Sequence, residues 1–303
     1  MELIQAAWLL PITGPPIREG VVAVSAGRVA WVGRPGDPGL PDGPLHRLGD
    51  GLVAPAVTRD AALGTGAPTP GAPERAAVRS MFDRIAPRYD LLNRLLSAGT
   101  DVRWRRRAVD LVELEPPLRV LDLCTGTADL LIEAVGRDPR NTGLGVDLAQ
   151  GMLARGVHKL ARRGLSRRAW LVGGDGERLP VREAGYDAAL VGFGIRNVSD
   201  PLAALREVHR ALRPGGRFVV LEFSMPEGLL GRLYRTYFTT VLPRIGGLVS
   251  GDRSAYSYLP ASVASFPKPS EFAALMEQAG FGAVRFEPLT LGIAYLHRGE
   301  KPR

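Results

Sequence analysis

The chain has 303 residues, 45% of them hydrophobic, and a formal net charge of +8 that comes mainly from arginine. This length exceeds one average domain but is short for two large ones, and the apolar content suffices for a substantial core. The single cysteine, Cys124, excludes intramolecular disulfides and suits a reducing compartment. The sequence shows no secretory signal pattern and no uncharged apolar run of the ~20 residues that cross a bilayer, so a cytoplasmic location is expected.

Residues 1–73 differ in pattern from the rest of the chain. Three short runs rich in β-forming residues, Ile4–Leu10, Val21–Ser25 and Arg28–Val32, are separated by glycine and proline turns. A stretch dominated by Gly, Pro, Ala and Thr follows at about 64–73 and is typical of a linker. We therefore predict a small β-rich unit over 1–73 and a larger domain over 74–303.

The β-rich unit resembles the opening strands of amidohydrolases, in which a metal-binding His-x-His pair follows a Pro-Gly dipeptide. Here Pro55-Ala56 takes the place of that dipeptide, and Val57–Leu63 contains no histidine. Metal-dependent hydrolysis therefore has no ligands in this segment, and no metal site is expected. We interpret the unit as an accessory β unit or a fused remnant, with the alternative that nothing functional precedes Glu74.

Helical patterns extend from Arg75 to Glu113, ahead of the first strand of the larger domain. We expect these helices to cap the ligand cleft. Tyr89 and Asn93 lie within them and would close the site from above.

The stretch VLDLCTGTADL, Val120–Leu130, predicts a buried strand that passes through a turn at Gly126 into a helix. Backbone N–H groups and the dipole at such a helix N-terminus favour a carboxylate or a phosphate. Gly143–Asp147 predicts a second strand that ends in an acid, about 20 residues after the turn, where an acid that binds ribose hydroxyls belongs. The two features together predict nucleotide or nucleoside binding.

The residues after the turn favour a particular nucleoside. Dinucleotide-binding loops use glycines that let the backbone approach a pyrophosphate, but Ala128 and Asp129 occupy this part of the loop. A carboxylate at this place is unfavourable for a pyrophosphate and favourable for a cationic ligand. S-adenosylmethionine carries an ammonium and a sulfonium, so the local charge suits it better than a nicotinamide dinucleotide.

Strands and a helix alternate further along the chain. Strands are predicted at Ala169–Val172, Ala188–Phe193 and Arg217–Phe223. A helix is predicted over Leu202–Leu212 and should end at the Arg-Pro-Gly-Gly turn, 213–216, because proline cannot continue it. This alternation predicts an α/β fold with a mostly parallel sheet that binds ligands at its C-terminal edge.

Many residues between about 74 and 303 match the pattern of one known family. They are Phe82, Asp83, Ile85, Ala86, Tyr89, Asp90, Asn93, Ser97, Trp104, Arg105, Leu121, Asp122, Gly126, Thr127, Asp129, Asp147, Met152, Leu153, the FGIRNV segment at 193–198, Asp200, the LEFS segment at 221–224, Leu242, Pro243, Ile245, Gly246, Tyr256, Tyr258, Leu259, the AGF segment at 279–281, Leu296, His297, Gly299 and Lys301. With these motifs the chain resembles the ubiquinone/menaquinone biosynthesis C-methyltransferases. The resemblance implies a class I methyltransferase fold, Rossmann-like, with a mostly parallel seven-stranded sheet and helices on both faces.

Two residues depart from the family pattern. The loop that reads GTGD in the family has Ala128 in place of its last glycine, and Gly192 stands where relatives often have serine. Helical backbone angles at Ala128 would tolerate the methyl group, whereas a left-handed conformation would not. Neither change removes a charge or a large side chain.

The resemblance implies that S-adenosylmethionine is the cofactor. Thr127 and the loop backbone would meet its methionine end, Asp147 its ribose and Asp175-Gly176 its adenine, while Asp122 and Asp129 order the loop or meet the ammonium. The residues expected to bind the cofactor are Asp122, Gly126, Thr127, Asp147, Asp175 and Gly176.

The resemblance also implies methylation of a ring carbon on a reduced, prenylated quinone. Such a carbon becomes nucleophilic when its neighbouring phenol ionises, and Arg196 would stabilise the phenolate directly or through an ordered water. Asn197 would orient that water or a ring oxygen, with Tyr89 and Asn93 as the further catalytic residues. His297 is interpreted as a structural histidine, with a role as base as the alternative.

The segment Leu229–Val249 alternates apolar and aromatic residues with arginines. It predicts a core helix, or a lid whose apolar face receives the isoprenoid tail, and the two are compatible. Tyr256, Tyr258 and Phe266 would continue the substrate wall.

The expected partner is a prenylated demethylquinol, in the menaquinone or the ubiquinone branch. The arginines are scattered, which favours solvated helix surface, and peripheral contact with anionic lipid at the inner face of the plasma membrane is the alternative. Nucleic acid is not an expected partner, and the oligomeric state is open. The competing hypotheses are a binding protein of the same fold without turnover and a methyltransferase for another small aromatic substrate.

Overall fold

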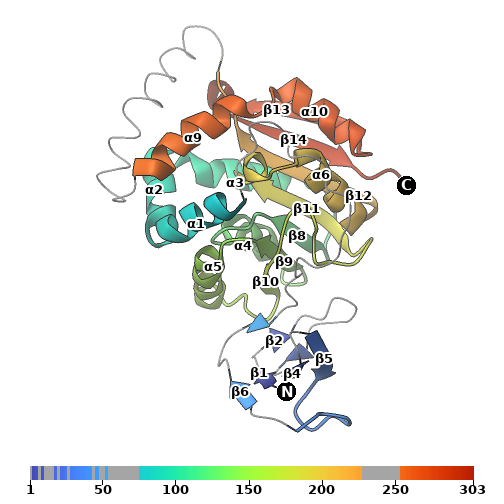
Figure 1. Ribbon diagram of the computed structural model, residues 1–303. Coiled ribbons are helices and arrows are strands. Elements are labelled where there is room, and N and C mark those ends of the chain that lie inside the picture. The colour runs from blue at the N-terminus through green and yellow to red at the C-terminus, as the bar shows by residue number, and fades with distance from the viewer. Residues whose placement is uncertain are drawn as a thin grey trace.

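The computed structural model describes residues 75–97, 99–226 and 253–303, with shorter stretches between residues 2 and 53 (Figure 1). Its main feature is a seven-stranded sheet with the strand order β10-β9-β8-β11-β12-β14-β13. The strands of this sheet are β8 (Arg119–Leu123), β9 (Thr142–Asp147), β10 (Ala169–Gly173), β11 (Tyr186–Gly192), β12 (Leu212–Phe223), β13 (Gly282–Leu289) and β14 (Ala294–Glu300).

The direction of the strands creates a place for a ligand. Strands β8 to β12 pair in parallel, and β14 runs antiparallel to both β12 and β13, so β13 has the same direction as the first five. The chain moves outward from β8 to β10 and returns to β11 on the other side of β8. The C-terminal ends of β8 and β11 therefore flank a topological switch point, where α/β sheets bind ligands. This topology confirms the predicted fold class.

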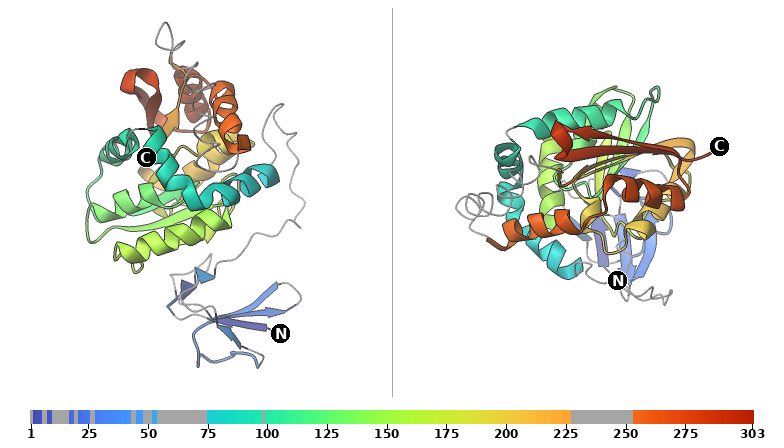
Figure 2. Two further views of the ribbon diagram at one scale, coloured as in Figure 1. Left: turned by 90° about the vertical axis from the view of Figure 1, so that its left-hand side faces the viewer. Right: turned by 90° about the horizontal axis from the view of Figure 1, so that it is seen from above.

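Helices cover both faces of the sheet (Figure 2). Helices α3, α4 and α5 pack on one face, and α6 and α10 pack on the other. The helices are α1 (Arg75–Ile85), α2 (Tyr89–Leu96), α3 (Thr100–Asp110), α4 (Asp129–Gly136), α5 (Gln150–Arg162), α6 (Pro201–Ala211), α9 (Arg253–Ser265) and α10 (Pro269–Gln278), with the 3-10 turns η1 (Ala86–Arg88), η2 (Ile195–Asn197) and η4 (Thr290–Gly292).

The central strands are buried on both faces because the two helical layers enclose them. In β12, Phe218 and Val220 join the cluster under α6 and α10, whereas Val219 and Leu221 join the cluster under α3 and α4. This alternation is the side-chain period of a strand. The consequence is a rigid sheet whose C-terminal edge holds the turns that follow each strand in fixed positions.

The N-terminal residues form two small sheets beyond the β10 edge of the large sheet (Figure 1). Their strand orders are β5-β4-β1-β6 and β3-β2-β7. The strands are β1 (Glu2–Gln5), β2 (Trp8–Leu9), β3 (Ile17–Arg18), β4 (Val21–Ser25), β5 (Arg28–Gly33), β6 (Leu45–Arg47) and β7 (Leu52–Val53). Short strands were expected here, but the boundary between a unit over 1–73 and a domain over 74–303 stays a prediction, because the linker at 64–73 lies outside the described residues.

One element differs from the sequence prediction. Helix α6 ends at Ala211, but the Arg-Pro-Gly-Gly segment that should form a turn belongs to β12. Gly215 N–H donates to the Lys301 carbonyl at 2.8 Å, and Lys301 N–H donates to the Gly216 carbonyl at 2.9 Å. The chain nevertheless turns within this strand, as the glycine indicated: Gly215 has a φ of 75°, and the pairing of β12 with β11 shifts at 213–216. The segment is thus a bulge whose backbone partners come from the chain beyond β14.

Two further predictions concern the region around α9. The segment Leu229–Val249, expected as a core helix or lid, lies outside the described residues, as does the side chain of Tyr256. Phe266 packs against Phe272, with ring centroids 5.0 Å apart, and so belongs to the core beside α10.

Candidate active site

A cavity opens at the C-terminal edge of the sheet, beside the switch point. We call the turns after β8, β9, β10 and β11 the floor, and the segment of α1, η1 and α2 (75–96) the cover. The floor contributes Cys124, Gly126, Asp147, Asp175, Gly176 and Asn197 to the lining, and the cover contributes Phe82 and Tyr89. The cavity therefore joins the N-terminal helices of the larger domain to the turns that follow four of its strands.

The turn after β8 has a strained backbone. Cys124 has a φ of 51°, Gly126 of 55° and Ala128 of 66°, all in the left-handed region. For Gly126 this conformation carries no steric penalty, but for Ala128 it is the unfavourable case considered above. Ala128 is completely buried, and its methyl group lies next to Gly156 of α5. The turn thus keeps its shape in spite of the substitution because the glycine opposite leaves room for the methyl group.

Asp122 orders this turn from below. Its Oδ2 accepts hydrogen bonds from Thr125 Oγ1 at 2.6 Å and from the Leu131 N–H at 3.2 Å. Burial raises the pKa of Asp122 to about 7, since desolvation disfavours the charged form. Asp122 is not among the residues that line the cavity. Of its two predicted roles, the structure supports ordering of the loop.

Asp147 ends β9 and lines the cavity. Its Oδ2 accepts from the Gly126 N–H and its Oδ1 from the Ala149 N–H, each at 2.8 Å. Burial raises the pKa of this carboxyl, while the backbone hydrogen bonds act in the opposite direction. Each carboxylate oxygen has a second lone pair. The geometry is that of a fixed acceptor with capacity left for two ligand hydroxyls.

The turn after β10 lines the same cavity as the turn after β8. Asp175 Oδ1 accepts from the Glu177 N–H at 3.0 Å, which shapes this turn. A Cβ on Gly176 would lie 3.0 Å from Leu123 Cδ1, so a side chain there would crowd the end of β8. The close approach explains the glycine and keeps this wall of the cavity flat.

Thr127 does not line the cavity, although it was expected to bind the cofactor. Its side chain is buried, and its Oγ1 donates to Asp90 Oδ1 at 2.6 Å and accepts from Lys159 Nζ at 3.0 Å. The hydroxyl is thus engaged in joining the floor to the cover. The sequence could not show this, because Asp90 and Lys159 lie far from Thr127 along the chain.

Residues after β11 form the next part of the floor. Phe193 lines the cavity with a φ of 58°, an unusual conformation for a bulky residue and one found at functional sites. Asn197 also lines the cavity, and its Oδ1 accepts from the Tyr258 hydroxyl at 3.0 Å. Gly192 lies at the end of β11, where a Cβ would be 3.2 Å from Leu130 Cδ2.

Arg196 is held in a buried ion pair. Its Nη1 donates to Glu222 Oε1 and to the Phe193 carbonyl, each at 2.6 Å, and its Nε donates to Ser262 Oγ at 3.4 Å. The side chains of Arg196 and Glu222 are only 6% and 1% exposed. The guanidinium also lies 5.5 Å from the Phe223 ring centroid. Among the described residues, the two N–H groups of Nη2 have no hydrogen-bond partner. Arg196 is fixed beside the cavity, and it is not among the lining residues.

The cover places Tyr89 over the floor, as expected from the sequence. Tyr89 shares a hydrogen bond with Asn93 one turn later in α2, and burial raises the pKa of its hydroxyl. Phe82 of α1 packs edge-on against the Tyr89 ring, with centroids 6.2 Å apart. Tyr89 lines the cavity and Asn93 does not, so the connection of Asn93 with the cavity is its hydrogen bond with Tyr89.

Several lining residues had no predicted role. They are apolar and come from the floor, the cover and helix α5: Val78, Leu148, Met152 and Val198. They form a surface suited to a flat heterocycle. Of these four, Leu148 and Val198 follow predicted strand ends, whereas Val78 and Met152 lie in helices and had no such signal in the sequence. The Cys124 thiol lines the same cavity, and burial raises its pKa well above the usual value, which argues against a thiolate nucleophile.

His297 has the environment of a structural histidine. It lies on β14 and packs edge-on against Phe272, with ring centroids 5.0 Å apart. Its Nε2 is 3.0 Å from the Pro269 carbonyl, and burial lowers its pKa to about 4. Among the described residues, His, Cys, Asp and Glu form no group of three that could hold a metal ion.

Comparisons with known proteins agree with this geometry. Residues 71–301 match the model of the ubiE/COQ5 methyltransferase family. A demethylmenaquinone methyltransferase of Thermus thermophilus is 51% identical over 223 residues, which cover 73% of this chain and 100% of the relative. A ubiquinone/menaquinone biosynthesis C-methyltransferase of Syntrophotalea carbinolica is 50% identical over 222 residues, or 73% of this chain and 92% of the relative.

Solved structures share the fold at lower identity. The [4+2]-cyclase SpnF has a TM-score of 0.58 and 18% identity, over 76% of this chain and 97% of its own. A SAM-dependent methyltransferase from Thermotoga maritima has a TM-score of 0.53 and 22% identity, over 74% of this chain and 99% of its own. Because one of the two is a cyclase, the shared fold alone does not specify the reaction.

Proposed function

The chain belongs to the ubiE/COQ5 methyltransferase family, as its sequence motifs indicated, and on that premise we propose that it transfers a methyl group from S-adenosylmethionine to a ring carbon of a prenylated demethylquinol. The observation that carries the proposal is the cavity itself. It combines a fixed carboxylate, Asp147, with apolar lining residues and an aromatic cover in a family whose relatives are named for this reaction.

The donor set of the floor fits S-adenosylmethionine. Asp147 offers acceptors for two ribose hydroxyls, and the turn at Gly126 offers backbone to the methionine end. Asp175 and Gly176 lie where a polar group and a flat wall would receive adenine. When bound, the cofactor supplies an activated methyl group. The contribution expected of the protein is therefore to align the quinol ring with that group and to exclude water.

The residues after β11 supply the catalytic part of the proposal. Because Arg196 is fixed beside the cavity and does not line it, it would stabilise the oxygen of the quinol through an ordered water as that oxygen gains negative charge. Glu222 offsets the charge of Arg196, so the stabilisation is that of an oriented hydrogen bond more than that of a free cation. Asn197 would orient the ring oxygen or a water from the floor, and Tyr89 would cover the opposite side of the ring.

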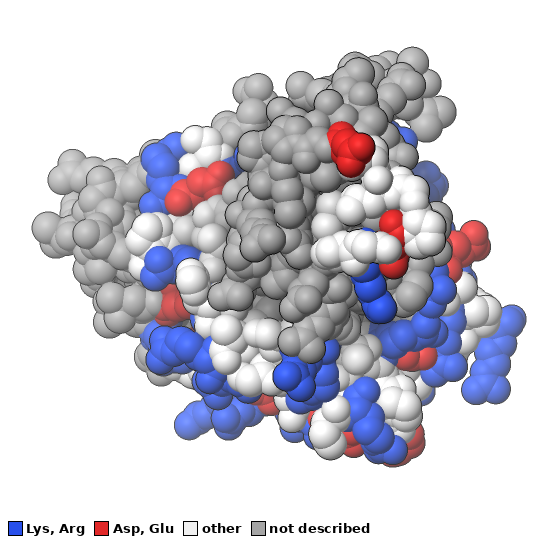
Figure 3. All heavy atoms as spheres, turned by 90° about the horizontal axis from the view of Figure 1, so that it is seen from below, with Lys and Arg blue, Asp and Glu red and all other residues white. Residues whose placement is uncertain are grey.

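The isoprenoid tail of the substrate suggests a location beside the membrane. Among the described residues, no helix is both long enough and apolar enough to cross a bilayer. Basic side chains are spread over several parts of the described surface with acidic ones between them (Figure 3). We propose a cytoplasmic protein with peripheral contact at the inner face of the plasma membrane, where anionic lipid attracts such a surface.

The nature of the substrate can be tested in cells. We propose demethylmenaquinol as the substrate. A methoxy-polyprenyl-benzoquinol is the alternative substrate, because it presents the same reacting half-ring. A strain that lacks this chain should accumulate demethylmenaquinone in a lipid extract, and the wild-type gene should restore menaquinone. Accumulation of a demethylated ubiquinone precursor would identify the other branch. An unchanged quinone profile would contradict the proposal, and so would failure of the wild-type gene to restore the methylated quinone, as expected of a binding protein without turnover.

A further inference from the structure

Helix α5 contacts the cover at three points along one stripe. The Gly151 N–H donates to Asp83 Oδ1 at 2.7 Å, and Arg155 Nη2 donates to the Pro87 carbonyl at 2.7 Å. Lys159 Nζ completes the stripe at 3.0 Å from Asp90 Oδ2. Residues spaced by four lie on the same side of a helix. Helix α5 therefore holds α1, η1 and the start of α2 along a single line.

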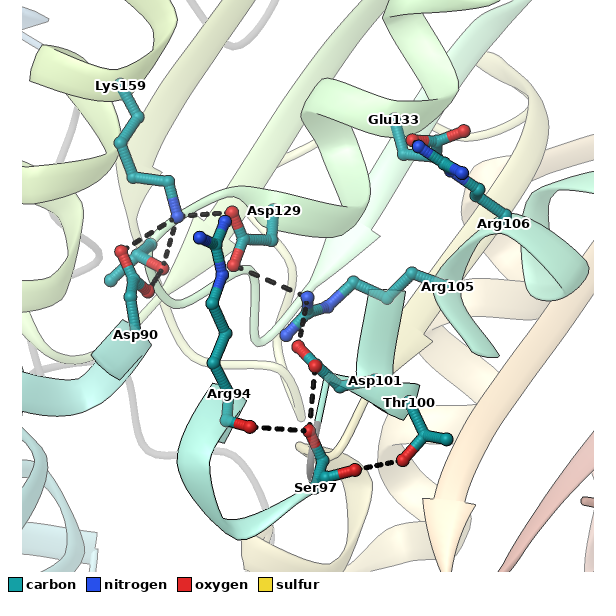
Figure 4. Close-up of polar contacts among 11 residues, drawn as sticks. Asp90, Arg94, Ser97, Thr100, Asp101, Arg105, Arg106, Asp129, Glu133 and Lys159 are labelled. Carbon is teal, nitrogen blue, oxygen red and sulfur yellow. Dashed lines mark hydrogen bonds and ion pairs between the residues drawn. The ribbon is translucent and has the colours of Figure 1, made fainter. Parts of the chain in front are cut away.

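Lys159 differs from the other two contacts because it also reaches the floor (Figure 4). Its Nζ lies 3.0 Å from Thr127 Oγ1 and forms an ion pair with Asp129, the first residue of α4. Thr127 in turn donates to Asp90. One ammonium thus joins four elements, namely α5, the turn before α4, α4 itself and α2.

The two aspartates occupy equivalent places. Asp90 and Asp129 each lie in the first turn of a helix, where a negative charge is favoured by the helix dipole. Lys159 bridges these two helix N-termini. A second cation, Arg105 of α3, approaches Asp129 at 3.6 Å and Asp101 at 2.7 Å, which extends the network to the next helix (Figure 4).

The network acts on the cavity through neighbours in sequence. Asp90 directly follows Tyr89, and Thr127 directly follows Gly126, and both of those neighbours line the cavity. The side chains of Lys159, Asp90 and Asp129 are 24%, 35% and 30% exposed, so the network is accessible to solvent at its edge. Fixing Asp90 against Thr127 therefore fixes the distance between the cover and the cofactor loop.

We propose that Lys159 is a positioning residue that clamps α2 onto the loop after β8 and so keeps Tyr89 over the cavity. Its effect on the reaction rests on the function proposed above. The clamp itself is a property of the fold and is measurable without turnover. Without the clamp, the arrangement with α2 against the loop after β8 is less populated. S-adenosylmethionine and the quinol both need this arrangement, so their apparent affinities fall in proportion to its population.

The test compares Lys159→Met, which keeps the aliphatic stem, with Lys159→Arg and with the control Arg162→Met. Arg162 is exposed near the end of the same helix. Lys159→Met should raise the Kd for S-adenosylmethionine and the KM for quinol about threefold to tenfold, with a smaller change in kcat, as expected for the loss of two partly exposed ion pairs. Lys159→Arg should restore most of this loss, and Arg162→Met should have no effect.

Amide hydrogen exchange distinguishes positioning from a general loss of stability. In Lys159→Met, exchange should become faster in 86–96 and remain unchanged in β8, β11 and β12. Asp90→Asn should give the same pattern of faster amide exchange in 86–96. If Lys159→Met does not fold, Asp90→Asn provides the test in its place. Combining both substitutions should add little to either one, since they break the same contact.

Unchanged exchange in 86–96, or effects of Asp90→Asn and Lys159→Met that simply add, would overturn the clamp. If wild-type protein transfers no methyl group to quinol but Lys159→Met still accelerates exchange in α2, the clamp stands and the proposed function fails. The two hypotheses therefore fail by different measurements.

Discussion

The floor and the cover of the cavity are held by two kinds of ion pair. On the floor, Arg196 and Glu222 are almost fully buried and form one short, well-directed pair. Under the cover, Lys159 meets two aspartates in a network that is about one-quarter to one-third exposed. Losing one partner of a buried pair leaves an uncompensated charge and is strongly destabilising, whereas each exposed pair contributes little. The buried pair therefore holds the floor in one geometry, whereas separating the cover from the floor would require little free energy from the ion pairs of Lys159.

This difference suits a site that must admit two reactants. Residues expected to act on the quinol oxygen, Arg196 and Asn197, belong to the part that the buried ion pair fixes, and preorganised donors are effective because they need no reorganisation during the reaction. Tyr89, which would cover the ring, belongs to the part that the more exposed ion pairs hold. Substitutions on the floor should therefore affect the chemical step, and substitutions under the cover should affect binding.

The largest expected effect is that of Arg196→Lys on the floor. An ammonium cannot reproduce the planar arrangement of a guanidinium, so the methyl-transfer rate should fall by about a hundredfold or more while the affinity for S-adenosylmethionine stays near that of the wild type. Raising the pH should partly restore the rate because more of the quinol ionises unaided. Normal turnover, or a defect confined to cofactor binding, would remove Arg196 from the mechanism.

Asp147→Asn tests the cofactor side of the floor. The substitution keeps the size of the side chain and removes its charge, and loss of a charge-assisted hydrogen bond costs about 1.5–3 kcal/mol. Calorimetry should show weaker binding of S-adenosylmethionine by a factor of at least ten. Thermal stability should also fall, because the NH2 group of asparagine cannot accept one of the two backbone N–H groups that the carboxylate accepts. An unchanged Kd would show that another group binds the ribose.

A pH dependence of stability is expected from Asp122. Burial raises its pKa to about 7, above the value of about 3.9 in an unfolded chain. The protonated carboxyl favours the folded state, so its contribution is complete below pH 4 and is lost as the pH rises through 7. Between these values the wild type should lose up to about 1.4 kcal/mol per pH unit relative to Asp122→Asn. Urea unfolding of both proteins at pH 5 and pH 7 measures the difference, and parallel profiles would contradict the assignment.

Ala128→Gly should have the smallest effect. Relief of the left-handed strain at Ala128, worth about 1–2 kcal/mol, is offset by the loss of a buried methyl group and by the greater freedom of glycine in the unfolded chain. Stability should change by less than about 1 kcal/mol, and the methyl-transfer rate should stay within a factor of two. A large gain in rate would show that Ala128 impairs the enzyme. This result would contradict the interpretation that the turn after β8 keeps its shape with an alanine at this position.

The sequence was a better guide to the floor than to the cover. Strand ends carry recognisable patterns, so the positions of Asp147, Gly176 and Asn197 followed from the strands that precede them. The role of Thr127 was not accessible in this way, because its partners, Asp90 and Lys159, are brought to it only by packing of α2 and α5. The ion pair of Arg196 with Glu222 likewise depends on the pairing of β11 with β12. Local patterns identify which residues reach the edge of a sheet, and tertiary packing decides what each of them contacts.

The central claim is that residues of the floor, above all Arg196, act in methyl transfer. Its most direct test is a methyl-transfer assay with the purified protein. Wild-type protein, S-adenosylmethionine with a deuterated methyl group and a short-tailed demethylmenaquinol should be combined under reducing conditions and the products examined by mass spectrometry. We expect one labelled methyl group on the quinone ring, lost in Arg196→Lys and retained, with a higher KM, in Lys159→Met. Tight binding of S-adenosylmethionine without a labelled ring, or labelling that does not depend on Arg196, would contradict this account.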